Sequence, residues 1–364
     1  MIISLKKKII SKLKDLNYKI KYFFKIQRIP DIFDHINIET TSLCNLKCKF
    51  CAYDKRDFDI YPKSTMKIDM FNNIVNQSLN LGYRKIGLTP STGDIFMDKN
   101  ILEKLSLLDE KQNYEGYFFY TNFIPINHSQ IEKILLKSKK LIKFGISIYG
   151  HDNVTFQKFC GGSENAYKRL IDNLNFLLKL CEKNPNIKYK FEIGQRTEKN
   201  FLLEENDSQL SSIIKQFKNK YKVFYTANSF YDNWGGLVNE RDVRDLNIDL
   251  HTNEIKKYGS CSLIYSRMTI GANGLVNACA CRDANFTLRL GKVENEKLKD
   301  IISLKNEKYK DLIERQEKND FDDVCRSCSF YKSIYKNNYP TWILRNQKKN
   351  YLNLNETLKI LQKR

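Results

Sequence analysis

Three cysteines near the start of the chain could bind one soft metal centre. They form the run Cys44-Asn-Leu-Lys-Cys48-Lys-Phe-Cys51, directly after an expected strand. Thiolates on one short loop can converge on iron or zinc. An electron-transfer cluster normally takes four cysteines, so three on a four-iron (4Fe-4S) cluster leave one iron open for a ligand or substrate. A catalytic zinc also uses three protein ligands, but zinc motifs usually pair a Cys-x-x-Cys with distant Cys or His.

A second group of cysteines lies in the last third of the chain. Cys261 precedes an expected β-hairpin, Cys279 stands at its end, and Cys325 and Cys328 form a later Cys-x-x-Cys. Four thiolates in this order suit a structural zinc or a fully ligated iron–sulfur cluster. Cys281 lies beside this group and is surplus to a four-thiolate site.

From residue 35 onwards, short β-rich runs alternate with helical patterns. This alternation predicts an α/β fold in which a parallel sheet is covered by helices. The six strands fit a partial (β/α)6 TIM-like barrel, whose chemistry lies at the C-terminal ends of the strands. Ser163 and Asn206 are expected near helix N-caps. The expected strands are 35–40, 84–89, 117–121, 141–148, 187–194 and 221–226, and the expected helices are 66–80, 99–111, 128–138, 163–182 and 205–218.

The pattern changes after about residue 240. A hairpin is expected with its turn at Asn273-Gly274, followed by a charged helical stretch at 294–319. This part is expected to be a small β-hairpin/helix auxiliary-cluster domain. The predicted domains are 1–33, a basic amphipathic N-terminal helix; 34–240, the partial barrel; 241–341, the auxiliary-cluster domain; and 342–364, a polar and partly helical tail.

The N-terminal segment is basic and amphipathic. Its apolar residues recur every three or four positions with lysines between them, which predicts a helix that Pro30 ends. Such a helix could lie on an anionic membrane or contact a partner, or pack on its own domain. Lysines interrupt what would have to be the core of a signal peptide, and no run of about 18 apolar residues occurs. A reducing, cytoplasmic location is therefore expected.

The whole chain is also basic, with 62 Lys and Arg against 42 Asp and Glu and a net charge of +20. A solvated basic surface is the plainer explanation, and an anionic partner is the alternative.

The Cys-x-x-x-Cys-x-x-Cys run, with Phe50 before its last cysteine, resembles the radical S-adenosylmethionine (radical SAM) superfamily, and the resemblance extends over residues 34–335. It implies a 4Fe-4S cluster whose open iron is chelated by the amino and carboxylate groups of S-adenosylmethionine. The reduced cluster gives one electron, the sulfonium C–S bond breaks, and a 5′-deoxyadenosyl radical removes hydrogen from the substrate. An electron donor such as flavodoxin or ferredoxin is implied as a partner.

Other family features are matched at strand ends. Thr89-Pro-Ser-Thr-Gly93-Asp94 resembles a Gly-Gly-Glu-like turn that binds the methionine amino group, Thr121-Asn122 resembles Thr-Asn-Gly, and the run around Ser147 resembles a ribose-binding signature. Phe123 replaces the last Gly of the second motif, and Tyr149 replaces the Asp of the third. The resemblance assigns cofactor binding to Phe50, Gly93, Asp94, Asn122, Ser147 and Glu192.

The second cysteine group resembles the SPASM/twitch extension of these enzymes. No Cys follows Cys328, which favours the shorter twitch form with one auxiliary 4Fe-4S cluster on Cys261, Cys279, Cys325 and Cys328. Such a cluster would accept an electron in a two-electron oxidation. An epimerase instead needs a hydrogen donor, and the thiol of Cys281 is the catalytic candidate; a buried small side chain is the alternative. Arg282 and Asp283 could contact substrate or form a salt bridge.

The sequence therefore predicts a radical SAM oxidoreductase or epimerase that acts on an unactivated C–H bond of a polar small molecule, with sugars or aminocyclitols preferred. A ribosomal-peptide maturase is the second hypothesis. An RNA-modifying radical SAM enzyme is a third, although a nucleic-acid partner is not expected because no nucleic-acid-binding motif is appended. The fourth is a non-catalytic interaction protein that uses both cysteine groups for zinc.

Overall fold

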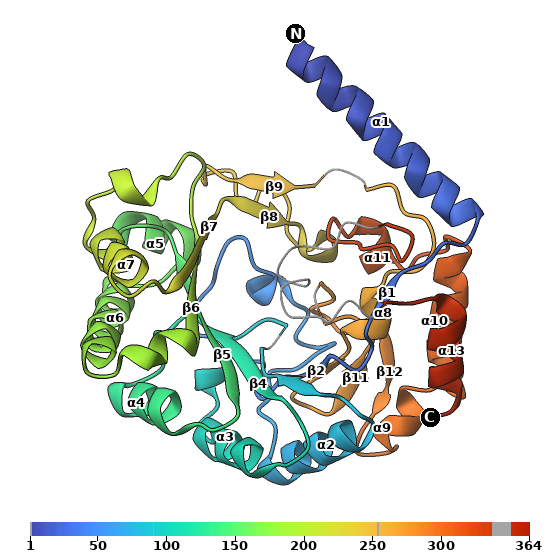
Figure 1. Cartoon of the computed structure of the whole chain (residues 1–364), viewed down its shortest axis with the longest axis horizontal. Coiled ribbons are helices and arrows are strands. Elements are labelled where there is room, and N and C mark those ends of the chain that lie inside the picture. The colour runs from blue at the N-terminus through green and yellow to red at the C-terminus, as the bar shows by residue number, and fades with distance from the viewer. Residues whose placement is uncertain (1, 90, 253–254, 281, 337–350) are drawn as a thin grey trace.

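A mixed sheet of nine strands forms the centre of the molecule (Figure 1). The computed structural model describes residues 2–89, 91–252, 255–280, 282–336 and 351–364. The strands lie in the order β12-β11-β10-β2-β3-β4-β5-β6-β7. Their bounds are β2 (His35–Ile38), β3 (Lys85–Gly87), β4 (Gly116–Thr121), β5 (Leu141–Tyr149), β6 (Phe191–Arg196), β7 (Phe224–Asn228), β10 (Thr269–Ile270), β11 (Leu275–Asn277) and β12 (Arg289–Lys292).

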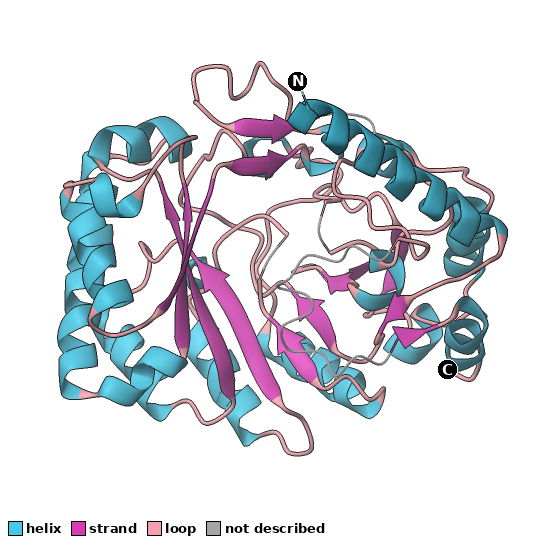
Figure 2. Cartoon of the chain, turned by 45° about the horizontal axis from the view of Figure 1, so that its top comes forward, coloured by secondary structure: helices cyan, strands magenta, loops and turns pink. Residues whose placement is uncertain are grey.

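The strands from β2 to β7 are parallel, each pairing with the next along the chain. Helices follow the strands and cover the outer side of the curved sheet (Figures 1 and 2). This is the predicted partial (β/α)6 barrel, since a parallel connection needs a crossover that packs back onto the sheet. The helices are α2 (Ile68–Asn80), α3 (Ile101–Glu110), α4 (His128–Lys137), α5 (Asn153–Cys160), α6 (Glu164–Lys183) and α7 (Gln209–Asn219), with short 3-10 turns at η1 (Tyr53–Lys55), η2 (Ile95–Met97), η3 (Pro185–Tyr189) and η4 (Leu203–Glu205).

Side chains alternate between the two faces of the sheet. In β5, Phe144, Ile146 and Ile148 are buried towards the helices, whereas Ser147 and Tyr149 are half-buried on the opposite side. We call that opposite side the inner face. Because successive residues of a strand point to opposite faces, alternate residues of the parallel strands lie on this inner face.

The C-terminal region continues the same sheet. Strand β10 pairs in parallel with β2, with Thr269 opposite Asn37 and Ile270 opposite Ile38. A hairpin joins β10 to β11 and turns at Gly274, whose φ of 82° favours glycine. The remaining elements of this region are β8 (Phe230–Asp232), η5 (Trp234–Gly236), β9 (Asp249–His251), α8 (Leu263–Ser266), α9 (Leu298–Ile301), α10 (Glu307–Glu317) and α11 (Asp323–Ser327).

The segment after helix α1 (Ile2–Phe23) pairs with a segment near the end of the chain. Strand β1 (Ile29–Pro30) pairs with β13 (Tyr351–Leu352), which leads into α13 (Leu354–Gln362). Part of the expected tail is thus paired and packed, with Leu361 fully buried; its residues 342–350 lie outside the described residues. Helix α1 runs beyond the body of the molecule (Figure 1). Among the described residues, no helix has the length and apolar character to cross a membrane.

Several sequence expectations were wrong in detail. Helix α1 ends at Phe23, well before Pro30, which lies in β1. Ser208 rather than Asn206 caps α7 with its side chain. The expected strand at 187–194 begins only at Phe191, because Pro185–Tyr189 forms the 3-10 turn η3. The stretch 294–319 is divided into α9 and α10. Local pattern does not fix these ends, since tertiary contacts decide where an element stops.

A buried ion pair fixes the segment after β3. Lys104 of α3 donates to the carboxylate of Asp98 and to the Met66 carbonyl, and both charged side chains have no exposed surface. Lys104→Met should lower the free energy of unfolding by about 3–5 kcal/mol, because it leaves the Asp98 carboxylate buried without its cation. Urea denaturation measures this. The double variant Asp98→Asn/Lys104→Met serves as the control and should lose much less; an equal loss in both variants would contradict the ion-pair explanation.

Candidate functional site

The first cysteine group lies on the loop after β2, at the C-terminal edge of the parallel strands. Two backbone bonds hold this loop against the end of α5: Lys47 N–H donates to Cys160 O and Lys49 N–H donates to Phe159 O, both at 3.0 Å. On its other side, Ser42 N–H donates to Ser64 O. The loop therefore presents its cysteines from a backbone that is fixed at both ends.

The three thiols lie close enough to influence one another. Burial raises the pKa of the Cys44 thiol to about 12, with Asp94 and Cys51 adding to the effect. Burial also raises the pKa of Cys48 and of Cys51. The metal-free thiols are thus protonated at neutral pH, and a metal centre must displace their protons. No three His, Cys, Asp or Glu side chains within the described ranges gather closely enough for a single metal ion. A four-iron cluster differs from a single ion in that each thiolate binds a different iron.

The loop after β3 packs directly on the cysteine loop. Asp94 N–H donates to Leu43 O at 2.8 Å. Gly93 has φ 134°, and a Cβ there would lie 2.7 Å from the Leu43 carbonyl oxygen, so glycine is required. The Asp94 carboxylate is buried and accepts bonds from Phe96 N–H, the Thr121 hydroxyl and Asn122 N–H. Its role in this structure is to tie the β3 and β4 loops together.

The loop after β4 joins the same site. The Asn122 side chain donates to Asn45 Oδ1 at 2.7 Å, which links it to the cysteine loop. Phe123 is fully buried at φ 64°, in the left-handed region where glycine is favoured. Asn173 of α6 stabilises this turn by donating to the carbonyls of Phe123 and Ile126. The structure thereby brings Gly93, Asp94 and Asn122 together beside the cysteine loop.

On the inner face of β5 and β6, two small residues leave room beside the sheet. Ser147 lies opposite Gly194, and a Cβ on Gly194 would meet no atom nearer than 3.8 Å. Tyr149 closes one side of this space, since its ring packs on Phe50 at 5.3 Å. Phe50 itself is 1% exposed and packs among aromatic rings. We call the surface formed by Ser147, Gly194 and Tyr149 the inner shelf.

Glu192 does not lie where the sequence placed it. We expected it near the end of its strand, but it is the second residue of β6, because this strand begins at Phe191. On the inner face its carboxylate pairs with Lys143 at 3.3 Å and accepts a bond from the Tyr120 hydroxyl at 3.2 Å. These three residues form a polar cluster deeper in the barrel than the cysteine loop.

Sequence reasoning missed a second buried cluster at the strand ends. Glu39, directly after β2, is fully buried and accepts a bond from the Tyr61 hydroxyl. Arg56 donates to Thr92 Oγ1 at 2.7 Å and stacks on the Tyr61 ring. One feature of the sequence could have revealed Glu39. It is a single carboxylate between the Ile-containing strand and the run Thr40-Thr41-Ser42, a place where neither a buried strand nor a turn requires a charged residue.

Burial raises the pKa of Glu39 from 4.5 to about 7. A carboxyl whose pKa is higher in the folded state stabilises the fold fully below its unfolded pKa, and this stabilisation is lost as the pH rises through the folded value. The melting temperature of the wild type should therefore fall between about pH 5 and about pH 8. Glu39→Gln should remove most of this fall, as measured by thermal denaturation. Glu103→Gln, on the exposed side of α3, is the control and should keep the wild-type profile.

Several buried polar atoms near the cysteine loop lack a partner within the described part of the chain. Such atoms are rare in folded proteins and indicate a ligand, ion or water that satisfies them. They lie on the segments that follow β2 and β3, on both sides of the cysteine loop. They are Glu39 Oε1, Thr40 Oγ1, Thr89 Oγ1 and Ser91 Oγ.

In the second cysteine group, the sulfur atoms accept hydrogen bonds from N–H groups. Three cysteines influence one another electrostatically, and the sulfur of each accepts an N–H bond: Cys261 from Lys332 N, Cys325 from Gln316 Nε2, and Cys328 from Phe330 N. N–H donors to sulfur stabilise thiolate ligands and tune cluster potentials. Cys279 follows β11 in the same domain, and the candidate hydrogen donor Cys281 lies outside the described residues.

Arg282 connects the two cysteine groups. Its guanidinium pairs with Asp232 and lies over the Trp234 and Phe330 rings, at 4.9 and 4.2 Å from their centroids. Trp234 in turn donates to the Phe50 carbonyl at 2.9 Å. Arg282 contributes to lowering the pKa of both Cys51 and Cys328, against the larger effect of burial. The salt bridge, one of the two alternatives from the sequence, is therefore present.

Asp283 also has a structural role. It is 2% exposed and accepts bonds from Asn277 Nδ2 and from the backbone N–H groups of Thr287 and Leu288.

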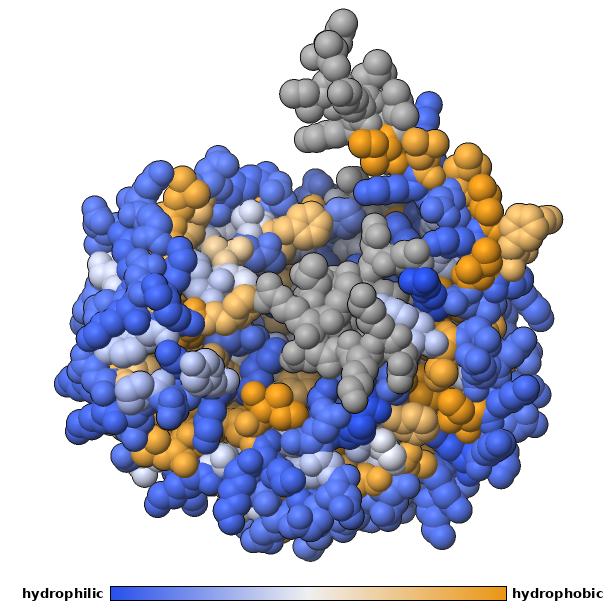
Figure 3. Space-filling model, viewed as in Figure 1, coloured by the Kyte–Doolittle hydropathy of each residue, from blue (hydrophilic) through white to orange (hydrophobic). Residues whose placement is uncertain are grey.

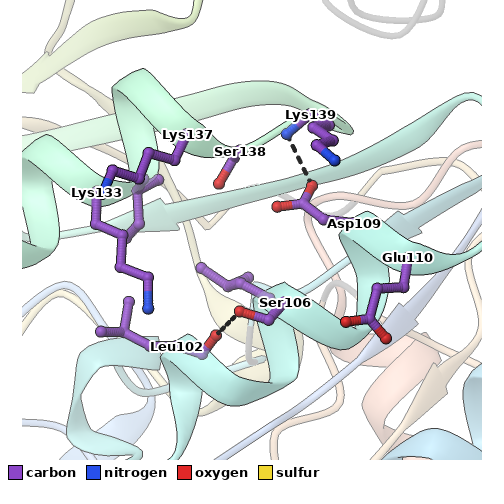
Figure 4. A pocket seen from close by; sticks show the side chains of 10 residues that line it. Leu102, Ser106, Asp109, Glu110, Lys133, Lys137, Ser138 and Lys139 are labelled. Atoms are coloured by element: carbon purple, nitrogen blue, oxygen red, sulfur yellow. Dashed lines mark hydrogen bonds between the residues drawn. The ribbon is translucent and has the colours of Figure 1, made fainter.

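A shallow hollow on the outside of the barrel lies between α3 and α4 (Figure 4). Charged side chains line it, including Asp109, Lys133 and Lys139. Asp109 accepts bonds from the backbone before β5, so this hollow lies at the N-terminal ends of the strands. It is at the opposite end of the barrel from the cysteine loop and is not the candidate active site.

Comparison with known proteins agrees with this geometry. Residues 261–329 match the model of the SPASM domain, an iron–sulfur cluster-binding domain. The structure of BtrN in complex with AdoMet and 2-DOIA is similar over 89% of this chain and 100% of BtrN, at 15% identity and a TM-score of 0.53. Streptococcus suis SuiB bound to the precursor peptide SuiA is similar over 92% of this chain and 76% of SuiB, at 16% identity and a TM-score of 0.54. No curated protein sequence matches this chain.

The chain thus has the same fold as BtrN and SuiB. Within that fold it carries a SPASM iron–sulfur domain at residues 261–329. Both the barrel and the C-terminal cluster domain expected from the sequence are confirmed at this level.

Proposed function

We propose that this chain is a radical SAM enzyme, with a 4Fe-4S cluster on Cys44, Cys48 and Cys51 and S-adenosylmethionine bound beside it. The observation that carries this proposal is the joining of three strand-end loops at the cysteine run, through Asp94 to Leu43 and Asn122 to Asn45. When bound, cluster and S-adenosylmethionine supply a 5′-deoxyadenosyl radical that removes hydrogen from substrate. The loops' task is to hold the cofactor in one orientation.

The protein offers polar atoms and space for this cofactor. Thr89 and Ser91 present buried hydroxyls that have no hydrogen-bond partner among the described residues, on the loop that resembles the methionine-binding turn. Asp94 is already engaged by three donors, so its role is to position this loop rather than to offer free oxygens to the cofactor. The inner shelf at Ser147 and Gly194 provides room for the nucleoside.

The inner shelf can be tested by filling it. Gly194→Leu should weaken binding of S-adenosylmethionine to the reconstituted enzyme by about tenfold or more, because the added side chain occupies an already bounded space. Equilibrium dialysis measures the affinity. Gly194→Ala is the matched control and should stay within about twofold of wild type, since its Cβ meets only ordinary contacts. Wild-type affinity in Gly194→Leu would place the cofactor elsewhere.

For the substrate, we propose a sugar or aminocyclitol that is oxidised or epimerised. This chain spans all of BtrN, which binds 2-DOIA in its structure. Tyr120, Lys143 and Glu192 form a polar cluster on the inner face. They can replace the hydrogen bonds among themselves by hydrogen bonds to hydroxyl or amino groups of a substrate. Oxidation needs an acceptor for a second electron, and the SPASM domain is where this chain could hold one.

A ribosomal peptide is the second candidate substrate. The observation in its favour is the similarity to SuiB bound to its precursor peptide. However, this chain spans only 76% of SuiB, whereas it spans the whole of BtrN.

The test is formation of 5′-deoxyadenosine by the anoxically reconstituted enzyme with dithionite and S-adenosylmethionine. We expect a basal rate that rises when the correct substrate is added from a panel of sugars, aminocyclitols and peptides. With a deuterated substrate, deuterium should appear in 5′-deoxyadenosine. No 5′-deoxyadenosine from a protein with full iron content would overturn the proposal, and stimulation by peptides alone would replace the sugar hypothesis.

A further inference from the structure

Helix α1 docks on the body through its aromatic side. The Tyr18 hydroxyl accepts a bond from Tyr258 N–H at 2.9 Å, and the Tyr18 side chain is 4% exposed. One turn later, the Tyr22 hydroxyl donates to Glu317 O at 3.0 Å and its ring packs edge-on against Tyr335. These contacts fix the second half of the helix to the C-terminal domain.

The apolar side of α1 points the other way. Leu13, Leu16, Ile20 and Phe23 follow one another at three- and four-residue spacing and are 60, 54, 44 and 78% exposed. With about 100° between successive residues, this row lies roughly 160° around the helix from Tyr18 and Tyr22. Figure 3 shows apolar side chains along α1 at the edge of the body. A row of large apolar side chains that is exposed to solvent indicates an interaction site.

The charge around this row is strongly positive. Residues 1–29 contain eight Lys and one Arg against a single acid, Asp15. Lys12 and Lys19 are exposed beside this row, Lys14 is exposed on the tyrosine side of the helix, and Asp15 is paired with Lys256 of the body. A second copy of this chain would bring the same positive charge to the contact, so self-association is disfavoured electrostatically. An anionic surface gains from both the lysines and the apolar row.

We propose that α1 is a membrane-docking helix that binds the surface of bilayers containing anionic phospholipids. Leu13, Leu16, Ile20 and Phe23 insert at the level of the headgroups, and the flanking lysines contact the lipid phosphates. The tyrosine side keeps the catalytic body attached to the helix while it lies on the membrane. This site is separate from the proposed active site and does not depend on radical chemistry.

Vesicle co-sedimentation of the full-length holoenzyme tests the proposal. Wild type should bind vesicles of phosphatidylcholine with 30 mol% phosphatidylglycerol and bind pure phosphatidylcholine far more weakly, and 0.5 M salt should weaken the binding. Leu13→Glu/Leu16→Glu/Ile20→Glu should lower partitioning by about tenfold or more, because each change puts a carboxylate into the apolar row. These positions are exposed, so iron content and melting temperature should not change.

The matched control is Leu136→Glu/Val154→Glu/Leu202→Glu, which makes the same charge change at exposed apolar residues elsewhere on the surface. It should retain wild-type partitioning. Equal binding by both triple variants, or no binding of the wild type to either vesicle, would overturn the proposal. A concentration-dependent dimer in light scattering that only the α1 variant abolishes would assign the row to self-association instead and would also overturn it.

Discussion

Replacing Cys44, Cys48 and Cys51 together by alanine is expected to lower bound iron from about eight to about four atoms per chain after anoxic reconstitution. The variant should form no 5′-deoxyadenosine above background, because no open-site cluster can then assemble. The reason is structural as well as chemical: all three thiols lie on one loop whose backbone is held by α5 and by Ser64. Iron and sulfide analysis and product assay measure both effects.

Cys181→Ala is the matched control for this variant. Cys181 is fully buried on α6, outside both cysteine groups. It should keep full iron content and wild-type 5′-deoxyadenosine formation, at a small cost in stability. Unchanged iron in the triple variant would show that this loop does not hold the cluster. A fall from about four iron atoms to none, with zinc retained, would make the C-terminal site a structural zinc site.

The second large effect is expected from Cys325→Ser/Cys328→Ser. Bound iron should again fall from about eight to about four atoms, this time from the C-terminal domain. Cleavage of S-adenosylmethionine should continue, because the first cysteine loop is untouched, but formation of an oxidised product should fall to background since the second electron has no acceptor. Both replaced sulfurs accept N–H bonds and influence Cys261, so their loss dismantles the arrangement that the SPASM domain provides.

The two variants distinguish the sites by their products. If Cys325→Ser/Cys328→Ser retained full product formation, the auxiliary cluster would be structural and the reaction redox-neutral. If it lost 5′-deoxyadenosine as well, the damage would have reached the barrel, and the link through Arg282 and Trp234 to Phe50 is the route to examine. Ser327→Ala, on the same short helix but with no thiol removed, controls for disturbance of α11.

The sequence by itself predicted the cluster-binding loop, and it determined the order of the elements. The spacing of Cys44, Cys48 and Cys51 is a local property, because three ligands within one loop need little help from the rest of the chain. The alternation of strands and helices could also be predicted from the sequence, because hydrophobic periodicity is a pattern of neighbouring residues along the chain. The turn at Gly274 was correct for the same reason: the residue that tolerates a positive φ is visible in the sequence.

Tertiary structure alone decided what each strand-end residue contacts. Asp94 belongs to a run that resembles a cofactor-binding turn. Its carboxylate nevertheless accepts bonds from the Thr121 hydroxyl and the Asn122 N–H, and these two donors are close only because the neighbouring strand β4 ends there. Glu192 changed place because η3 delays the start of β6. Burial raises the pKa of Glu39, and this burial comes from tertiary packing: Glu39 accepts bonds from Tyr61 and from the backbone of Ala272, in a hairpin more than two hundred residues away.

Helix α1 shows the same division most clearly. Its periodicity predicted an amphipathic helix, and an amphipathic helix normally turns its apolar side to the body. Here the body offers hydrogen-bonding groups at Tyr258, Glu317 and Asn319, which satisfy tyrosine hydroxyls and not aliphatic side chains. The direction in which the apolar row points was therefore set by partners that are distant in sequence, and periodicity carries no information about them.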